Sequence, residues 1–355
     1  IMSNRTSFYK KIQKKVFGSR SESYRYQEQL KHLSGSYESF SFAVSDYDIT
    51  QHPAYHQADI IHFHYVSNFL DYPSFFKVNQ KPIVWTLHDM NPFLGGFHYE
   101  GDLQRNAKPL QDLNEQVRNQ KFSVLRKSRM HIVTPSKWML DASQRSEMFA
   151  EFPHSHIPNG IDVSVFRAYD KRFCREVFGL PQDKIVLLFI SEKIDNYRKG
   201  FDLLREAFSE LDQLPVVICD LGHQESLHVN TISDDSIADE RLMSLLYNAA
   251  DAFVLASRED NFPNVVLEST ACGIPVIAFP VGGVSEVISD GFNGILAENN
   301  LITGSSLFSA IQRYIKCRHI FDAHKIHLHT AQHYSVERQV ANYSNLYRKL
   351  LTHAL

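Results

Sequence analysis

Two acids in the second half of the chain have a spacing that suits a sugar bound beside a phosphate group. Asp260, preceded directly by Glu259, stands eight residues before Glu268, and a glycine pair, Gly282 and Gly283, follows. Carboxylates accept hydrogen bonds from hydroxyl groups, and backbone N–H groups at a helix start or a glycine-rich turn bind phosphate oxygens. The arrangement predicts a sugar or ribose held next to a diphosphate.

A structural interpretation of the same acids is also open. Asp260 or Asn261 would cap the following helix, and Glu268 would pair with a Lys or Arg inside the fold. For any single acid this is the more common outcome, whereas the combined pattern favours a ligand site.

Two apolar segments and one helix must position these acids. The segments 251–257 and 275–279 are short and aliphatic, which is typical of parallel strands buried on both faces. Between them, 264–272 has a helical pattern that a proline opens and a glycine ends. Open α/β sheets bind ligands where such strands end, so we expect the loop before this helix to line the site.

A basic pair, Arg198 and Lys199, stands at the start of a helix expected within 196–211. The helix macrodipole disfavours cations at that end by a few tenths to about 1 kcal/mol, and a bound anion would reverse this effect. We therefore expect the pair to bind a diphosphate; the alternative is a solvated surface pair.

Two histidines in the first half are candidates. His88 ends the strand-like run 82–89 beside Asp89, at the edge where a side chain reaches a ligand, which sets it apart from most of the 18 histidines. His98 follows a Gly-Gly turn that would act as a hinge for the loop that carries it. A packed loop histidine is an equal alternative for His98.

Composition limits the function classes. A chain of 355 residues with 43% hydrophobic residues can bury a large core and suggests two domains. Its net charge of −3 disfavours nucleic acid as a partner. The four cysteines lack metal-ligand spacing and no G-x-G-x-x-G follows a strand, so we expect no metal, no cofactor and no dehydrogenase.

The apolar runs in the sequence also indicate where in the cell the protein is expected. The longest apolar runs are under ten residues and no signal-peptide pattern is present, so we expect a cytoplasmic protein. The segment 5–17 has the pattern of a short basic amphipathic helix. It would lie on the inner face of a membrane, or it is an ordinary surface helix; the pattern favours neither.

Alternating apolar runs and helical patterns predict two α/β domains. Strands are expected at 58–66, 82–89, 130–136, 154–162, 183–191, 215–222, 251–257 and 275–279. Helices are expected at 121–129, 137–149, 170–178, within 196–211, and at 239–249, 264–272, 305–316 and 335–351. This succession is typical of parallel sheets covered by helices.

The stretch SREDNFPNVVLESTACGIPVIAF (257–279) resembles the donor-site signature of the family-four glycosyltransferases of GT-B fold. In that family two acids spaced E-x7-E hold the donor sugar and the nucleotide ribose. Glu268 matches the second acid, and Asp260 stands at the first position. The runs IIHFHYVSNFLDYPSFF, KPIVWTLHDMNPFLGGFHY, IVTPSKWM and IPNGIDVSVF are similar to the acceptor-side domain of a branch that builds bacterial surface polysaccharides.

The resemblance implies a fold and an activity. Two Rossmann-like domains would face a cleft: 1–167, joined by the C-terminal helix 335–355, on the acceptor side, and 168–334 on the donor side. The enzyme would be a retaining, metal-independent hexosyltransferase that moves a sugar from a UDP- or GDP-linked donor to a saccharide or lipid-linked acceptor. Capsule, O-antigen or exopolysaccharide synthesis would be its setting.

The resemblance also implies residue roles. His88, Asp260 and Glu259 would act at the reacting sugar. The donor would be bound by Arg198, Lys199, Glu268, Asn264, Val265, Gly282 and Gly283. Lys199 matches the family's basic pair directly, whereas the usual arginine falls on Ile194, so that Lys193 or Arg198 would substitute for it.

One departure opens other readings of the function. Family members begin with a strand and a glycine-rich loop, but nothing before residue 58 has this pattern, which is consistent with an incomplete N-terminal domain. The alternatives are a GT-B epimerase or hydrolase of nucleotide sugars, and a nucleotide-binding protein with impaired catalysis.

Overall fold

The computed structural model describes residues 21–126, 128–190, 196–210, 216–221, 237, 239–298 and 301–352, and over 216–221 it describes the backbone alone. The expected basic helix at 5–17, together with Lys193 and Ile194, lies outside these residues. The chain divides into two compact units. Unit 1 comprises the residues up to Val133 and Asp141–Ser155, and unit 2 comprises Thr134–Leu140 and the residues from His156 on. The expected domain boundary at 167/168 stays a prediction.

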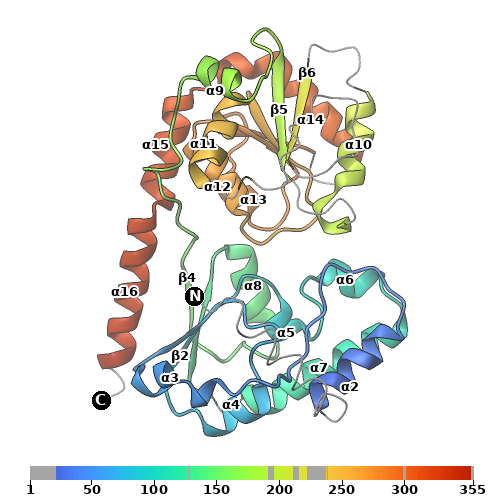
Figure 1. Ribbon diagram of the computed structural model, residues 1–355, viewed down its shortest axis with the longest axis vertical. Coiled ribbons are helices and arrows are strands. Elements are labelled where there is room, and N and C mark those ends of the chain that lie inside the picture. The colour runs from blue at the N-terminus through green and yellow to red at the C-terminus, as the bar shows by residue number, and fades with distance from the viewer. Residues whose placement is uncertain are drawn as a thin grey trace. The chain divides into compact units, whose positions relative to one another are not determined.

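Unit 1 is built around a sheet of four strands in the order β1-β2-β3-β4. Figure 1 labels β2 and β4 of this sheet. Its strands are β1 (Ile61–Phe63), β2 (Ile83–Thr86), β3 (Met130–Thr134) and β4 (His154–His156). The helices of the first half are α2 (Glu22–Lys31), α3 (Pro53–Gln57), α4 (Tyr72–Val78), α5 (Asn91–Leu94), α6 (Glu100–Arg105), α7 (Lys108–Leu125) and α8 (Lys137–Arg145), with a 3-10 turn η1 at Ile49–Gln51. β2 pairs in parallel with β1 and β3 and is buried throughout, as its aliphatic composition predicts.

The helix expected at 121–129 is wrong in its bounds. α7 begins at Lys108 and ends at Leu125. Its buried residues are Leu110, Leu113, Asn114, Val117, Lys121 and Leu125. These positions follow the 3.6-residue period of one helix face, and two of them are polar, which weakens the apolar pattern in the sequence.

Unit 2 contains a parallel sheet of five strands in the order β6-β5-β7-β8-β9. The strands β5 (Ile185–Ile190), β6 (Val216–Leu221), β7 (Ala252–Leu255) and β8 (Val276–Ala278) are close to the predicted ones, and β9 (Gly294–Leu296) is the fifth. The helices are α9 (Lys171–Val177), α10 (Phe201–Ser209), α11 (Glu240–Ala249), α12 (Asn264–Ala271), α13 (Val284–Val287), α14 (Gly304–Cys317), α15 (Ala323–Tyr334) and α16 (Val336–Thr352), with 3-10 turns η2 (Tyr197–Lys199) and η3 (Arg318–Ile320). Chain order reverses at β5, because β6 and β7 lie on opposite sides of it.

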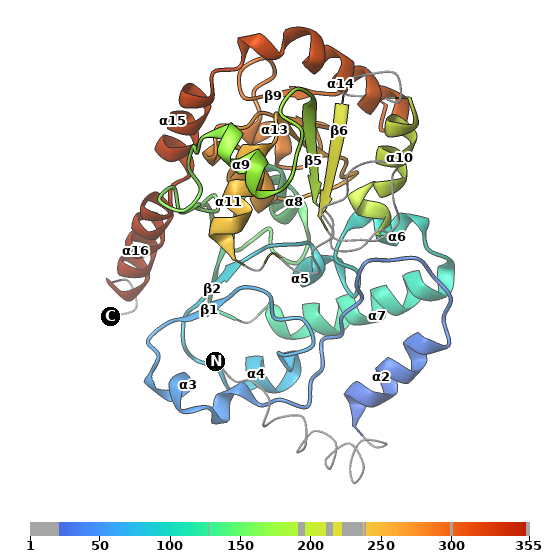
Figure 2. The same cartoon turned by 45° about the horizontal axis from the view of Figure 1, so that its top comes forward.

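Both faces of this sheet are covered, which explains why its strands are continuous apolar runs. Val186 and Leu188 of β5 belong to one buried cluster, and Leu187 and Phe189 belong to the other. α11 and α12 cover the first face, and α10 and α14 cover the second (Figure 1). Figure 2 shows α11 and α10 on opposite sides of the strands β5 and β6. The sheet is therefore a rigid support for the loops at its carboxyl edge.

The C-terminal helix forms as expected, but its apolar stripe is only partly buried. Tyr343 and Leu346 are buried, whereas Val340 is 55% exposed. That this helix joins the N-terminal domain stays a prediction. No helix in the described ranges combines the length and the apolar character that crossing a bilayer requires.

Candidate functional site

Loops from three strands of unit 2 meet at the carboxyl edge of the sheet. The turn η2 follows β5, the loop 256–263 follows β7, and Gly282 and Gly283 follow β8. A reversal of strand order like the one at β5 is where open α/β sheets form a crevice for a ligand.

Asp260 is the centre of a buried ion cluster. Lys199 Nζ lies 2.9 Å and Arg198 Nη1 3.2 Å from Asp260 Oδ2, and the Ser257 hydroxyl donates to the same oxygen. The side chains of Arg198 and Asp260 are each 8% exposed. Burial raises the pKa of Asp260, but Lys199 and Arg198 outweigh it and hold the pKa below its ordinary value. The carboxylate is therefore ionised and fixes both cations.

Arg198 and Lys199 were expected in the first turn of a helix, but they lie in the 3-10 turn that precedes α10. Asn196 caps the 3-10 turn η2, and Gly200 then adopts a left-handed conformation (φ +69°) that separates this turn from α10. Arg198 is buried and also donates to the carbonyl of Glu259 at 2.9 Å. The alternative of a solvated surface pair is therefore wrong.

The glycine pair allows a close backbone approach. A Cβ atom at Gly282 would lie 1.7 Å from the carbonyl oxygen of Asp260, and one at Gly283 would lie 2.0 Å from that of Asn261. The N–H of Gly283 donates to both carbonyls, at 3.2 and 2.9 Å. The loop after β8 thus supports the loop after β7, and the backbone donor of Gly283 is engaged within the protein.

Glu268 lies in α12 and has a hydroxyl partner. The Tyr247 hydroxyl donates to Glu268 Oε2 at 2.8 Å. Burial raises the pKa of Glu268, and the bond from Tyr247 opposes this rise. Within the described residues no Lys or Arg is paired with Glu268, so the structural ion pair considered for it is not found.

The start of α12 has no side-chain cap. Pro263 is the N-cap residue, so the alternative in which Asp260 or Asn261 caps this helix is wrong. Asn261 instead accepts a hydrogen bond from the Ser136 hydroxyl at 2.6 Å. Asn264 accepts one from the Asn159 side chain at 2.9 Å and is exposed, and Val265 is half-buried.

In unit 1, His88 lies just beyond the carboxyl end of β2, where it was expected, and a second histidine holds it. His64 Nδ1 and His88 Nε2 are 2.9 Å apart. Burial lowers the pKa of His88, His64 lowers it further, and Asp89 opposes both. Burial likewise lowers the pKa of the neighbouring His62 to about 3. These rings are therefore neutral at physiological pH.

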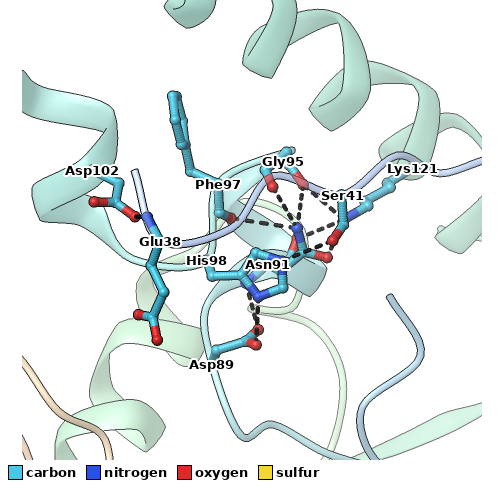
Figure 3. Close-up of polar contacts among 10 residues, drawn as sticks. Glu38, Ser41, Asp89, Asn91, Gly95, Phe97, His98, Asp102 and Lys121 are labelled. Carbon is cyan, nitrogen blue, oxygen red and sulfur yellow. Dashed lines mark hydrogen bonds and ion pairs between the residues drawn. The ribbon is translucent and has the colours of Figure 1, made fainter. Parts of the chain in front are cut away.

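His98 is buried and has partners at both ring nitrogens, as the packed-histidine alternative predicts. Nδ1 lies 2.7 Å from Asp89 Oδ2 and Nε2 lies 2.9 Å from Ser41 Oγ (Figure 3). Sequence reasoning did not select His64, although the alternation His62-Phe63-His64 at a strand end places two histidines on one face. It also missed Lys121, whose place on the apolar stripe of α7 was the available signal.

The described residues bring together Arg198, Lys199, Glu259, Asp260, Gly282 and Gly283, and place Glu268, Asn264 and Val265 on the helix that follows. His88 belongs to unit 1. Across the described ranges no three His, Cys, Asp or Glu side chains are grouped as a metal ion would need.

Family models match both halves of the chain. Residues 32–165 match the model described as Glycosyltransferase Family 4, and residues 170–325 match the one described as Glycosyl transferases group 1. Together with two parallel-sheet units, these matches assign the chain to the GT-B glycosyltransferase fold, as predicted. Its two halves are domains of the kinds from which such glycosyltransferases are built.

Individual proteins are similar as well. A D-inositol 3-phosphate glycosyltransferase of Catenulispora acidiphila is 32% identical over 180 residues, which cover 44% of this chain and 42% of that relative. The chain thus spans less than half the length of this curated relative. Sucrose-phosphate synthase of Thermosynechococcus elongatus has the same fold, with a TM-score of 0.68 at 19% identity over 84% of this chain and 76% of its own. HepE of Anabaena, solved with UDP and glucose, has a TM-score of 0.60 at 17% identity over 83% and 79%.

Proposed function

We propose that this protein is a retaining, metal-independent glycosyltransferase that moves a hexose-type sugar from a nucleotide-sugar donor to a hydroxyl group of an acceptor. The observation that carries the proposal is the ion cluster of Arg198, Lys199 and Asp260 at the reversal of strand order in unit 2. The two glycosyltransferase family matches support it, because one of them spans this cluster.

The cluster suits a leaving diphosphate. Lys199 keeps 35% of its side chain exposed, so its ammonium group can donate to a ligand while it is paired with Asp260. Negative charge builds up on the diphosphate as the bond to the sugar breaks, so fixed cations stabilise the transition state more than the bound donor. Because Asp260 and Glu259 stand on the same loop, they would orient the sugar beside this diphosphate.

The helix α12 would bind the nucleoside. One oxygen of Glu268 accepts from Tyr247, which leaves the other for the hydroxyl groups of a ribose. The first-turn N–H groups of Asn264 and Val265 point out of the helix start and would contact phosphate oxygens. His88 would lie at the reacting face of the sugar, as the family resemblance implies.

Two classes of acceptor molecule are proposed. The name of the curated relative suggests D-inositol 3-phosphate. The resemblance of the first half suggests instead a saccharide or lipid-linked acceptor in bacterial surface-polysaccharide synthesis, at the cytoplasmic face of a membrane that the segment 5–17 would contact. Both acceptors offer a hydroxyl group and are distinguished by the test below.

The test is a matrix of donors and acceptors. UDP-glucose, UDP-N-acetylglucosamine and GDP-mannose are each incubated with D-inositol 3-phosphate, with methyl glucoside, and without acceptor. NMR then detects the nucleoside diphosphate that is released and the anomeric configuration of the product. We expect release that depends on an acceptor, with retained configuration. Release without acceptor in every case would indicate a hydrolase or epimerase, binding without release would indicate a nucleotide-binding protein, and an inverted product would refute the retaining mechanism.

A further inference from the structure

Two chains of buried hydrogen bonds converge on residues 89–91 in unit 1. In the first, Ser41 Oγ lies 2.9 Å from His98 Nε2, and His98 Nδ1 lies 2.7 Å from Asp89 Oδ2. The other carboxylate oxygen, Oδ1, accepts from the backbone N–H of Asn91 at 2.9 Å. Figure 3 shows the His98 ring between Ser41 and Asp89. Because a carboxylate accepts only, Nδ1 carries a proton, and in the neutral ring Nε2 then accepts from Ser41.

The second chain of hydrogen bonds joins Lys121 and Asn91 to the backbone of residues 91–96. The ammonium group of the fully buried Lys121 donates to Asn91 O (2.7 Å), Asn91 Oδ1 (2.8 Å) and Gly95 O (2.7 Å). The Asn91 amide in turn donates to the carbonyls of Gly95 and Gly96, at 3.1 and 2.8 Å (Figure 3). Burial lowers the pKa of Lys121 to about 7, and the three acceptors match the three N–H groups of its ammonium form. The backbone on both sides of Asn91 is therefore fixed.

What these chains hold in place is the Asp89 carboxylate. Its side chain is 13% exposed, and it lines a small pocket together with His64, His88, Tyr65 and Ser67. The volume of this pocket is about 10 Å³. That is close to the space of one water-sized group. An anionic acceptor at the wall of such a pocket selects a group that donates a hydrogen bond, and a hydroxyl group meets both conditions.

We infer that Asp89 accepts a hydrogen bond from a hydroxyl group of the acceptor, and that His98 is the residue that positions Asp89 for this contact. The inference rests on the proposed function and extends it to a contact that the sequence did not assign. Asp89 fixes the tautomer of His98, Ser41 engages the other ring nitrogen, and Lys121 fixes the backbone of the loop. A carboxylate held at both oxygens cannot swing away, so the hydroxyl group meets a preorganised acceptor.

A purely structural network is the alternative, and a second Ser–His pair in unit 1 provides the control for it. Ser143 Oγ lies 2.9 Å from His154 Nε2, and His154 Nδ1 lies 2.8 Å from the carbonyl of Phe152. Both ring nitrogens are used, as in His98, but the second partner is a backbone carbonyl in place of a carboxylate. His154→Leu therefore removes an equivalent pair without touching Asp89.

The experiment compares His98→Leu, His98→Asn, Asp89→Asn and His154→Leu with the wild type, using the fastest donor and acceptor of the matrix above. The asparagine amide nitrogen lies near the position of Nδ1, so His98→Asn retains the donor to Asp89. We expect His98→Leu and Asp89→Asn to lower kcat/KM for the acceptor by about tenfold to a hundredfold, the range of one hydrogen bond to a charged group. The KM for the donor should not change.

His98→Asn should recover most of this loss, and His154→Leu should stay within about twofold of the wild type at a similar fall in Tm. The inference is overturned if His98→Leu and His154→Leu have the same effect on turnover, or if His98→Asn is no better than His98→Leu. A wild type that transfers no sugar to any acceptor refutes the proposed function itself, which is a separate outcome.

Discussion

The two ends of strand β7 carry similar ion clusters with different surroundings. Asp251 precedes the strand and pairs with Lys171 at 2.8 Å and with Arg175 at 2.6 Å. Arg175 also donates to four backbone carbonyls, those of Ala249, Pro181, Gln182 and Lys184. Asp251 in addition accepts from the N–H of Val186. At this amino edge the cluster serves to bind chain segments to one another.

Asp260 follows the strand and also has one Arg and one Lys as partners. Here the three charged residues lie where three loops meet, and the exposed part of Lys199 retains donors for a ligand. An acid with two cations is thus not by itself a binding site. The Lys171 side chain is 44% exposed, so exposure of the lysine does not separate the two clusters. The position at the carboxyl edge, where three loops meet, does.

The largest effect is expected from removing one cation at each edge. Lys199→Met should lower kcat/KM for the nucleotide sugar by about a hundredfold to a thousandfold, as the loss of one preorganised donor does. Lys171→Met, the matched change at the amino edge, should leave it within about twofold. Initial rates at varied donor concentration measure both. Equal losses would mean that Lys199 does no more than stabilise the fold.

The two acids should differ in how an anion compensates for their loss. Asp251→Asn and Asp260→Asn each leave buried cations without their partner, at a cost of about 3 kcal/mol. At roughly 100 times its Kd, pyrophosphate would restore about 2.7 kcal/mol to Asp260→Asn, because it takes the place of the carboxylate. Urea unfolding with and without pyrophosphate gives these values. Asp251→Asn keeps the site at Arg198 and Lys199, so it should gain only as much stability from pyrophosphate as the wild type does. A gain as large as that of Asp260→Asn would contradict the comparison.

Replacing Glu268 should have a smaller effect on stability, and the size of this effect should depend on pH. Since burial raises its pKa, the ionised form costs stability as pH rises through the folded-state pKa, and the neutral Glu268→Gln avoids this cost. We expect a Tm at or above that of the wild type at pH 7.5 and no difference at low pH. UDP affinity by calorimetry should fall about tenfold, or ~1.4 kcal/mol. A fall in Tm at pH 7.5 would show that the charge stabilises the fold.

The smallest effect is expected from removing divalent metal ions. The leaving diphosphate would be neutralised by Lys199 and Arg198, so EDTA should change the transfer rate by less than about twofold. Added Mg²⁺ at a range of concentrations is the matched condition. A rate that falls to the background with EDTA and returns with Mg²⁺ would refute metal independence.

The strands of unit 2 and the helix α12 were predictable because their apolar runs are continuous and glycine or proline marks their ends. The environment of individual polar residues was not. The burial of Arg198 depends on a loop some sixty residues further along the chain, which no local pattern contains. The first half of α7 was missed because Asn114 interrupts its apolar face. Lys121 lay inside the predicted helix 121–129, but its burial was missed because lysine is rarely a buried residue.

Gly200 and Gly282 have a practical consequence for changing what the protein accepts. Both adopt a left-handed backbone conformation, and a side chain at either would collide with a carbonyl oxygen of the loop after β7. A mutant library aimed at a new donor would therefore lose most of its members at these two positions. Randomising Asn264 and Val265 instead would vary side chains at the edge of the site. Every variant would then keep Gly200 and Gly282 and the loops that they support.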